Sequence, residues 1–144
     1  MTAPTAPRPA RRAPARRSPA RRALPLAGLV ALLLALTACG PGYRTVGVKD
    51  LHAASEPNRI VLDVRQPYEY AAGHVPGATL LPLPELPSRL AEVPADVPVY
   101  VYCHSGNRSK QASEILAKAG KKDIRDVRGG ILAWEAAGYP VTKD

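Results

Sequence analysis

Two short, mainly apolar runs, each followed by a polar segment, constrain the fold more than any other feature of the sequence. Residues 60–64 read IVLDV and residues 97–102 read VPVYVY. Runs of this kind are typical of strands that are buried on both faces, as in a parallel sheet covered by helices. We therefore expect the chain to fold around a buried sheet.

Weaker strand candidates and helical segments surround these two runs. The strand candidates are residues 45–48, 78–81 and 124–127. The helical segments are residues 49–55, 67–72, 85–92, 109–119 and 131–137. Strands that alternate with short helices predict an α/β fold with a mainly parallel sheet, in which a functional site lies beyond the carboxyl ends of the strands.

The first 38 residues have the composition of an export signal. Residues 1–22 contain seven arginines and no acidic residue, and residues 23–38 are almost wholly apolar. A basic segment, an apolar segment and small residues before a cleavage point describe a secretory signal peptide. The alternative is a transmembrane anchor, but the apolar run has 16 residues, whereas roughly 20 are needed to span a bilayer.

The end of this apolar run, residues 36–39 (LTAC), resembles the lipobox of bacterial lipoproteins. The resemblance implies that cleavage leaves Cys39 as the first residue and that Cys39 carries acyl chains such as palmitate, which anchor the protein to a membrane. We expect three parts: a signal peptide (1–38), the lipidated cysteine with a short tether (39–45), and a folded domain (46–144). The expected location is the extracytoplasmic side of the membrane.

Charge and ligand-type residues exclude two classes of function. Seven of the 20 Lys and Arg residues lie in the leader, which leaves 13 bases against 12 acids. This balance gives no reason to expect a nucleic-acid partner. Three scattered histidines and one available thiol have no recognisable ligand spacing, so neither a metal site nor a cofactor is expected.

The segment CHSGNR (103–108) is the main candidate for chemistry. A loop that runs from a strand into a helix directs backbone N–H groups and the helix dipole at one spot. Gly106 permits the curvature and Arg108 adds a positive charge. Cys103, the only other cysteine besides Cys39, is either a thiolate nucleophile in this cradle or a small buried residue, and the loop alone leaves both interpretations open.

Four segments together resemble a single rhodanese (sulfurtransferase) domain. They are LDVR (62–65), EYAAGHVPGA (69–78), CHSGNRS (103–109) and RGGILAWEAAGYPV (128–141). The resemblance implies a rhodanese-like α/β fold with a central parallel five-stranded sheet flanked by helices. It also implies that Cys103 takes a sulfane sulfur from a small donor such as thiosulfate and passes it, as a persulfide, to cyanide or a thiol.

The resemblance also assigns roles to the site residues. Cys103 is expected to be catalytic, and the donor is expected to bind to His104, Ser105, Gly106, Asn107, Arg108 and Ser109. Asp63 and Arg65 are expected to support the pocket edge, although a strand-end pair that only stabilises the fold is an equal alternative. His74 and Trp134 are expected to be packing residues.

Other functions remain compatible with parts of this pattern. A rhodanese-like module can bind partners or sense redox state without turnover, and a thiol-redox protein could be its partner. Cysteine-based phosphatases and arsenate reductases are a further alternative. Phosphatases of the related type have five residues between cysteine and arginine, whereas this chain has four between Cys103 and Arg108, and the shorter loop favours sulfur over a phosphoryl group.

Overall fold

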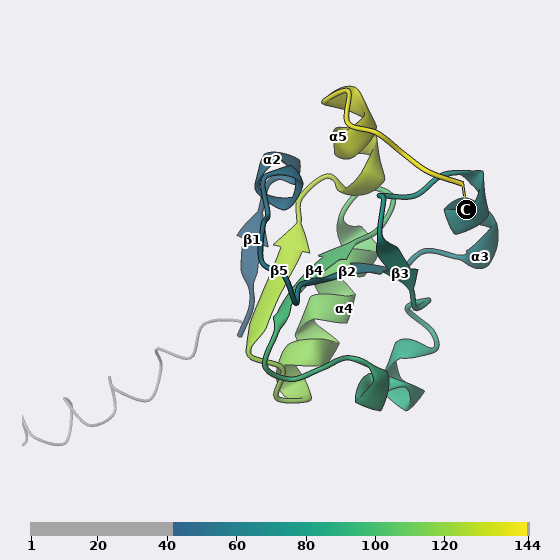
Figure 1. The fold of residues 1–144 in the computed structure, drawn as a ribbon. Coiled ribbons are helices and arrows are strands. Elements are labelled where there is room, and N and C mark those ends of the chain that lie inside the picture. The colour runs from purple at the N-terminus through teal and green to yellow at the C-terminus, as the bar shows by residue number, and fades with distance from the viewer. Residues whose placement is uncertain (1–41, 144) are drawn as a thin grey trace, which may run out of the picture. The chain divides into compact units, whose positions relative to one another are not determined.

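The computed structural model describes residues 42–143, which form a five-stranded, wholly parallel sheet with the order β1-β5-β4-β2-β3 (Figure 1). The strands are β1 (Arg44–Val46), β2 (Ile60–Asp63), β3 (Ala78–Leu80), β4 (Pro98–Tyr102) and β5 (Asp123–Val127). The two apolar runs of the sequence, β2 and β4, lie next to each other in the sheet. The predicted α/β fold with a parallel five-stranded sheet is confirmed.

Helices cover both faces of the sheet. They are α2 (Val48–His52), α3 (Pro67–Ala72), α4 (Asn107–Lys118) and α5 (Gly130–Ala136), together with the 3₁₀ turns η1 (Leu86–Ser88) and η2 (Leu90–Glu92). Figure 1 shows α3 near the β3 edge, with the C-terminus beside it.

Alternate residues of the central strands supply two separate cores. Leu62, Val99 and Val101 pack with α4 and the 3₁₀ turns. Tyr100 and Tyr102 face the opposite side and pack with α2 and α5. Because successive side chains of a strand point to opposite faces, a strand buried on both sides must be apolar at nearly every position. This requirement explains the unbroken runs in the sequence.

Several segments differ from the sequence-based expectations; for example, the helix expected at residues 49–55 ends at His52, and the helix expected at residues 109–119 starts at Asn107. Residues 85–92 form two 3₁₀ turns instead of one helix, and Pro87 lies inside the first turn, where it lacks an N–H donor. The expected strand at residues 45–48 begins one residue earlier and ends at Val46. The strand ends there because Gly47 caps α2. Gly47 N donates a hydrogen bond to the Asp50 carboxylate at 2.7 Å, and the helix begins at Val48, one residue before the expected start.

The expected signal peptide and Cys39 lie outside the described residues. Within residues 42–143, no helix is long and apolar enough to cross a membrane.

Candidate functional site

The loop between β4 and α4 carries the candidate nucleophile at the carboxyl edge of the sheet. Cys103 follows the last residue of β4 directly, and its side chain is buried, with 1% exposed. Gly106 N donates a hydrogen bond to Cys103 Sγ at 3.1 Å. Gly106 has a φ of 111°, which a residue with a Cβ adopts only with strain. The glycine therefore lets the loop turn back over the sulfur.

The first turn of α4 completes the cradle. Its first amides have no partner within the helix, and the helix dipole adds partial positive charge at this end. His104, Ser105 and Asn107 are exposed, so they lie at the mouth of the loop. The structure thus brings these predicted site residues together around Cys103.

Helix α5 holds the loop from the other side. Ile131 N donates to Cys103 O at 2.9 Å and Leu132 N donates to His104 O at 3.2 Å. Because a trans peptide unit points its C=O and N–H in opposite directions, these bonds turn the N–H groups of the following residues away from α5. The helix therefore orients the amides of the loop.

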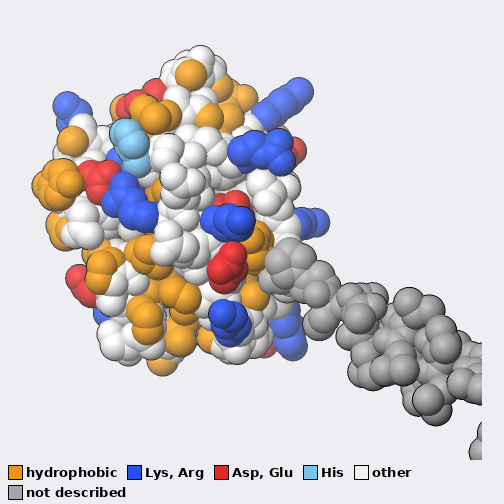
Figure 2. Space-filling view, turned by 180° about the vertical axis from the view of Figure 1, so that it is seen from behind, with side chains coloured by type: hydrophobic (Ala, Val, Ile, Leu, Met, Phe, Trp, Pro, Cys, Tyr) orange, Lys and Arg blue, Asp and Glu red, His pale blue; other side chains and the backbone are white. Residues whose placement is uncertain are grey.

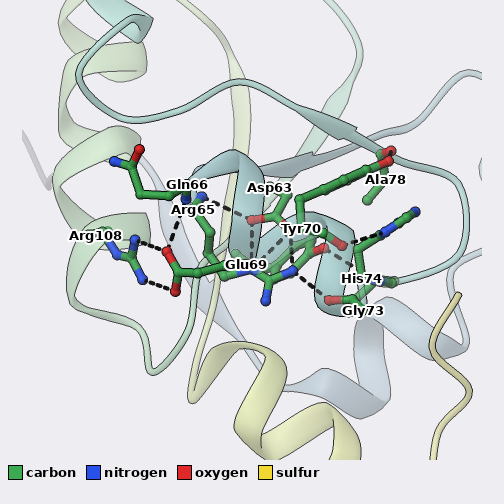
Figure 3. Close-up of polar contacts among 11 residues, drawn as sticks. Asp63, Arg65, Gln66, Glu69, Tyr70, Gly73, His74, Ala78 and Arg108 are labelled. Atoms are coloured by element: carbon green, nitrogen blue, oxygen red, sulfur yellow. Dashed lines mark hydrogen bonds and ion pairs between the residues drawn. The ribbon is translucent and has the colours of Figure 1, made fainter. Parts of the chain in front are cut away.

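Arg108 does not stand alone in the loop, because it is paired with Glu69 of α3. Arg108 Nη1 and Nη2 contact the two carboxylate oxygens of Glu69 at 2.7 and 2.8 Å (Figure 3). This bond to Arg108 lowers the pKa of Glu69 to about 2. Glu69 also accepts a hydrogen bond from Gln66 N at 3.0 Å, which fixes the carboxylate to the start of α3.

Sequence reasoning missed Glu69 as a site residue. Its partner lies 39 positions away along the chain, so no local spacing joins the two. One signal was available in the sequence. Glu69 opens the EYAAGHVPGA segment and stands three residues after Gln66, the position at which a glutamate bonds back to the first residue of a helix and is held in place.

Asp63 and Arg65 form a buried ion pair behind the loop, with 0% and 3% of each residue exposed. Arg65 Nη2 lies 2.6 Å from Asp63 Oδ2 and donates to Gly73 O at 2.8 Å (Figure 3). Tyr102 OH accepts a hydrogen bond from Val75 N at 3.2 Å. The pair therefore secures the segment after α3 next to Tyr102, the residue that precedes Cys103. This geometry is compatible both with support of the pocket edge and with a pair that only stabilises the fold.

The hydroxyl of Ser109, one of the residues predicted to bind the donor, is not open to a donor, which leaves its backbone amide at the start of α4. Ser109 is fully buried, and its hydroxyl lies 2.6 Å from Asp126 Oδ1 and 3.0 Å from Gly106 O. Burial raises the pKa of Asp126. Ser109 therefore links the loop to β5. Sequence alone could not predict this contact of the hydroxyl, because Asp126 lies 17 residues further along the chain.

His74 and Trp134 are packing residues, as predicted. His74 is buried and its ring stacks on Tyr70 at 3.6 Å between centroids. Its backbone also exchanges two hydrogen bonds of 2.9 Å with Thr142. Trp134 is buried and donates from Nε1 to Pro140 O at 2.7 Å.

Metal-ligand side chains are dispersed over the described domain, and charges of both signs are mixed on one of its faces. No cluster of three or more metal-ligand side chains occurs within residues 42–143. Figure 2 shows Lys and Arg side chains scattered over one face, with acidic side chains among them.

The chain resembles known proteins in sequence and in structure. The sequence profile described as "Rhodanese-like domain" matches residues 47–137. A protein named sulfurtransferase from Allochromatium vinosum is 42% identical over 82 residues, which cover 57% of this chain and 77% of that protein. A thiosulfate sulfurtransferase from Pseudoalteromonas translucida is 35% identical over 54% of this chain and 74% of its own length.

A solved structure shows the same fold. The crystal structure of a rhodanese-related protein from Thermoplasma volcanium superposes with a TM-score of 0.61 at 32% identity, and the match covers 71% of this chain and 100% of that one. Some other curated relatives are longer, since the match covers 59% of one from Bacillus subtilis and 56% of one from Synechocystis.

Proposed function

Because the chain belongs to the rhodanese-like domain family, we propose that it is a sulfurtransferase with Cys103 as its sulfur carrier. The proposed reaction moves a sulfane sulfur from a small donor such as thiosulfate to a thiophilic acceptor, either cyanide or a thiol. The observation that carries the proposal is the position of the Cys103 sulfur. It lies in the loop that leads into α4 and accepts a hydrogen bond from the Gly106 N–H.

The proposed cycle has two displacements. In the first, the Cys103 thiolate attacks the outer sulfur of thiosulfate, the S–S bond of the donor breaks, and sulfite leaves with the electron pair. In the second, cyanide attacks the outer sulfur of the Cys103 persulfide, thiocyanate forms, and the thiolate returns. Charge and atoms balance in both steps, so no oxidant, reductant or cofactor is needed.

The residues around Cys103 have separate roles in this cycle. The Gly106 N–H and the free amides at the start of α4 stabilise negative charge, first on the thiolate and then on the outer sulfur of the persulfide. Ile131 and Leu132 bond to the carbonyls of Cys103 and His104, and so keep the N–H groups of His104 and Ser105 oriented. His104, Ser105 and Asn107 are the side chains that an arriving donor meets first.

Intact mass spectrometry tests the proposal. The full-length chain incubated with thiosulfate should gain one sulfur atom, and addition of cyanide should remove it and release thiocyanate. Cys103→Ser should gain no sulfur, whereas the matched control Cys39→Ser should load normally. A folded protein that takes up no sulfur would support a binding or sensing module. Hydrolysis of an aryl phosphate without sulfur loading would support a phosphatase.

We further propose that residues 1–38 form a signal peptide and that a lipid on Cys39 holds residues 46–144 outside the membrane. The support is the order of basic, apolar and LTAC segments in the sequence. Cys39→Ala should abolish labelling by a palmitate analogue and release the protein from the membrane fraction. Unchanged fractionation and labelling would refute lipid anchoring.

A further inference from the structure

Arg108 is the only permanently charged side chain of the 103–108 loop, whose other side chains are those of cysteine, histidine, serine, glycine and asparagine. A positive charge at this place would attract a doubly charged donor such as thiosulfate more strongly than a singly charged one. The extent to which the charge of Arg108 is neutralised therefore affects which donor the protein prefers.

That charge is balanced by Glu69. Both terminal nitrogens of Arg108 contact the Glu69 carboxylate, at 2.7 and 2.8 Å. The two side chains are 31% and 16% exposed, so solvent reaches each only in part. Because the pKa of Glu69 is about 2, the carboxylate is ionised throughout the neutral range and the pair has no net charge there.

Arg108 is close enough to Cys103 to act on it. The pKa of Arg108 is raised chiefly by the hydrogen bonds that it donates to Glu69, and negative charge on Cys103 raises it further. Arg65, the other cation that acts on Glu69, is itself neutralised by Asp63 at 2.6 Å. Of the two cations that act on Glu69, only Arg108 belongs to the loop, so its pairing with Glu69 sets the charge that the loop itself presents.

We infer that Glu69 is a specificity-determining residue, which cancels the charge of Arg108 and so favours singly charged sulfane donors, such as organic thiosulfonates, over thiosulfate. This inference rests on the proposed sulfurtransferase function. The chemistry is the same for both donor classes: the Cys103 thiolate attacks the outer sulfur, and methanethiosulfonate loses methanesulfinate where thiosulfate loses sulfite. The two donors also differ in the intrinsic reactivity of their leaving groups, but that difference is the same for every variant and cancels when variants are compared.

Four full-length proteins separate the effect of charge from that of loop geometry. The Arg108–Glu69 position carries no net charge in the wild type, +1 in Glu69→Gln, −1 in Arg108→Gln, and none in the double variant. A glutamine at position 69 retains an oxygen that can accept the hydrogen bond from Gln66 N. The readout is the ratio of kcat/KM for thiosulfate to kcat/KM for methanethiosulfonate, because distortion of the loop that slows both donors cancels in this ratio.

The ratio should follow the net charge. We expect it to rise about three- to tenfold in Glu69→Gln and to fall by a similar factor in Arg108→Gln, the size expected for one partly screened charge. The double variant should return to within about twofold of the wild type, and 0.5 M salt should compress all differences. A ratio that is the same in all four proteins would overturn the inference and leave the proposed function intact. A wild-type protein that takes sulfur from neither donor would overturn both.

Discussion

Gly130 lies so close to Cys103 that no side chain fits between them. A Cβ on Gly130 would stand 2.3 Å from Cys103 O and 2.6 Å from His104 O, and its φ is 57°. The glycine allows α5 to approach the loop closely enough for its amides to bond to the loop carbonyls.

Gly130→Ala should therefore damage both stability and sulfur transfer. The methyl group must displace backbone atoms, and we expect a loss of about 2–4 kcal/mol in the free energy of unfolding and at least a tenfold slower loading of Cys103. Denaturant titration and mass-spectrometric loading rates measure the two effects. Gly138→Ala is the matched control, since Gly138 has a φ of 74° with nothing within 4 Å of the added atom. Equal losses in the two variants would contradict the steric explanation.

Asp63→Asn should be among the most destabilising single substitutions of the domain. It leaves the Arg65 guanidinium buried without a counter-charge, for which we expect a cost of about 3–5 kcal/mol in the free energy of unfolding. Urea unfolding measures the change. Asp96→Asn removes a carboxylate from the exposed pair with Lys122 and should leave the midpoint unchanged. A change of less than about 1 kcal/mol in Asp63→Asn would contradict the prediction that the charge of Arg65 needs the Asp63 carboxylate.

Glu69 should contribute stability that acid removes. Its pKa is lowered from 4.5 to about 2 by Arg108, so the folded state binds the proton less tightly than the unfolded state. The contribution is present above pH 4.5 and is lost as the pH falls toward 2. It amounts to about 1–3 kcal/mol for this partly exposed pair. The difference in unfolding free energy between wild type and Glu69→Gln should shrink over that interval, and a constant difference would be evidence against the ion pair.

Asp126 should have the opposite pH dependence. Burial raises its pKa, while Ser109, Lys110 and Arg128 act to lower it. Because the folded state binds this proton more tightly, stability should decrease as the pH rises from the ordinary aspartate range through the raised pKa. Asp126→Asn should remove that slope while the amide remains within hydrogen-bonding distance of Ser109. Thermal melts between pH 4 and 7 measure it, and parallel curves for the two proteins would contradict the assignment.

The sequence predicted the sheet and the position of Cys103 because both depend on local patterns. Strands buried on both faces need apolar residues at nearly every position, and a parallel sheet places its site at the strand ends. The partners of the loop were harder to predict, since Arg108–Glu69 and Ser109–Asp126 join residues 39 and 17 positions apart. Which polar side chains turn inward depends on packing that no local spacing encodes, so the buried position of the Ser109 hydroxyl and the role of Glu69 were not predicted.

The paired backbones of His74 and Thr142 also give the domain a mechanical property. Their two hydrogen bonds fasten the C-terminal segment to the stretch that follows α3, and Arg65 fastens that stretch to Asp63 at the end of β2. A pulling force on the C-terminal segment is therefore transmitted through these contacts to β2, the strand that pairs with β4. The C-terminal segment is thus held to the central sheet by backbone hydrogen bonds and a buried ion pair.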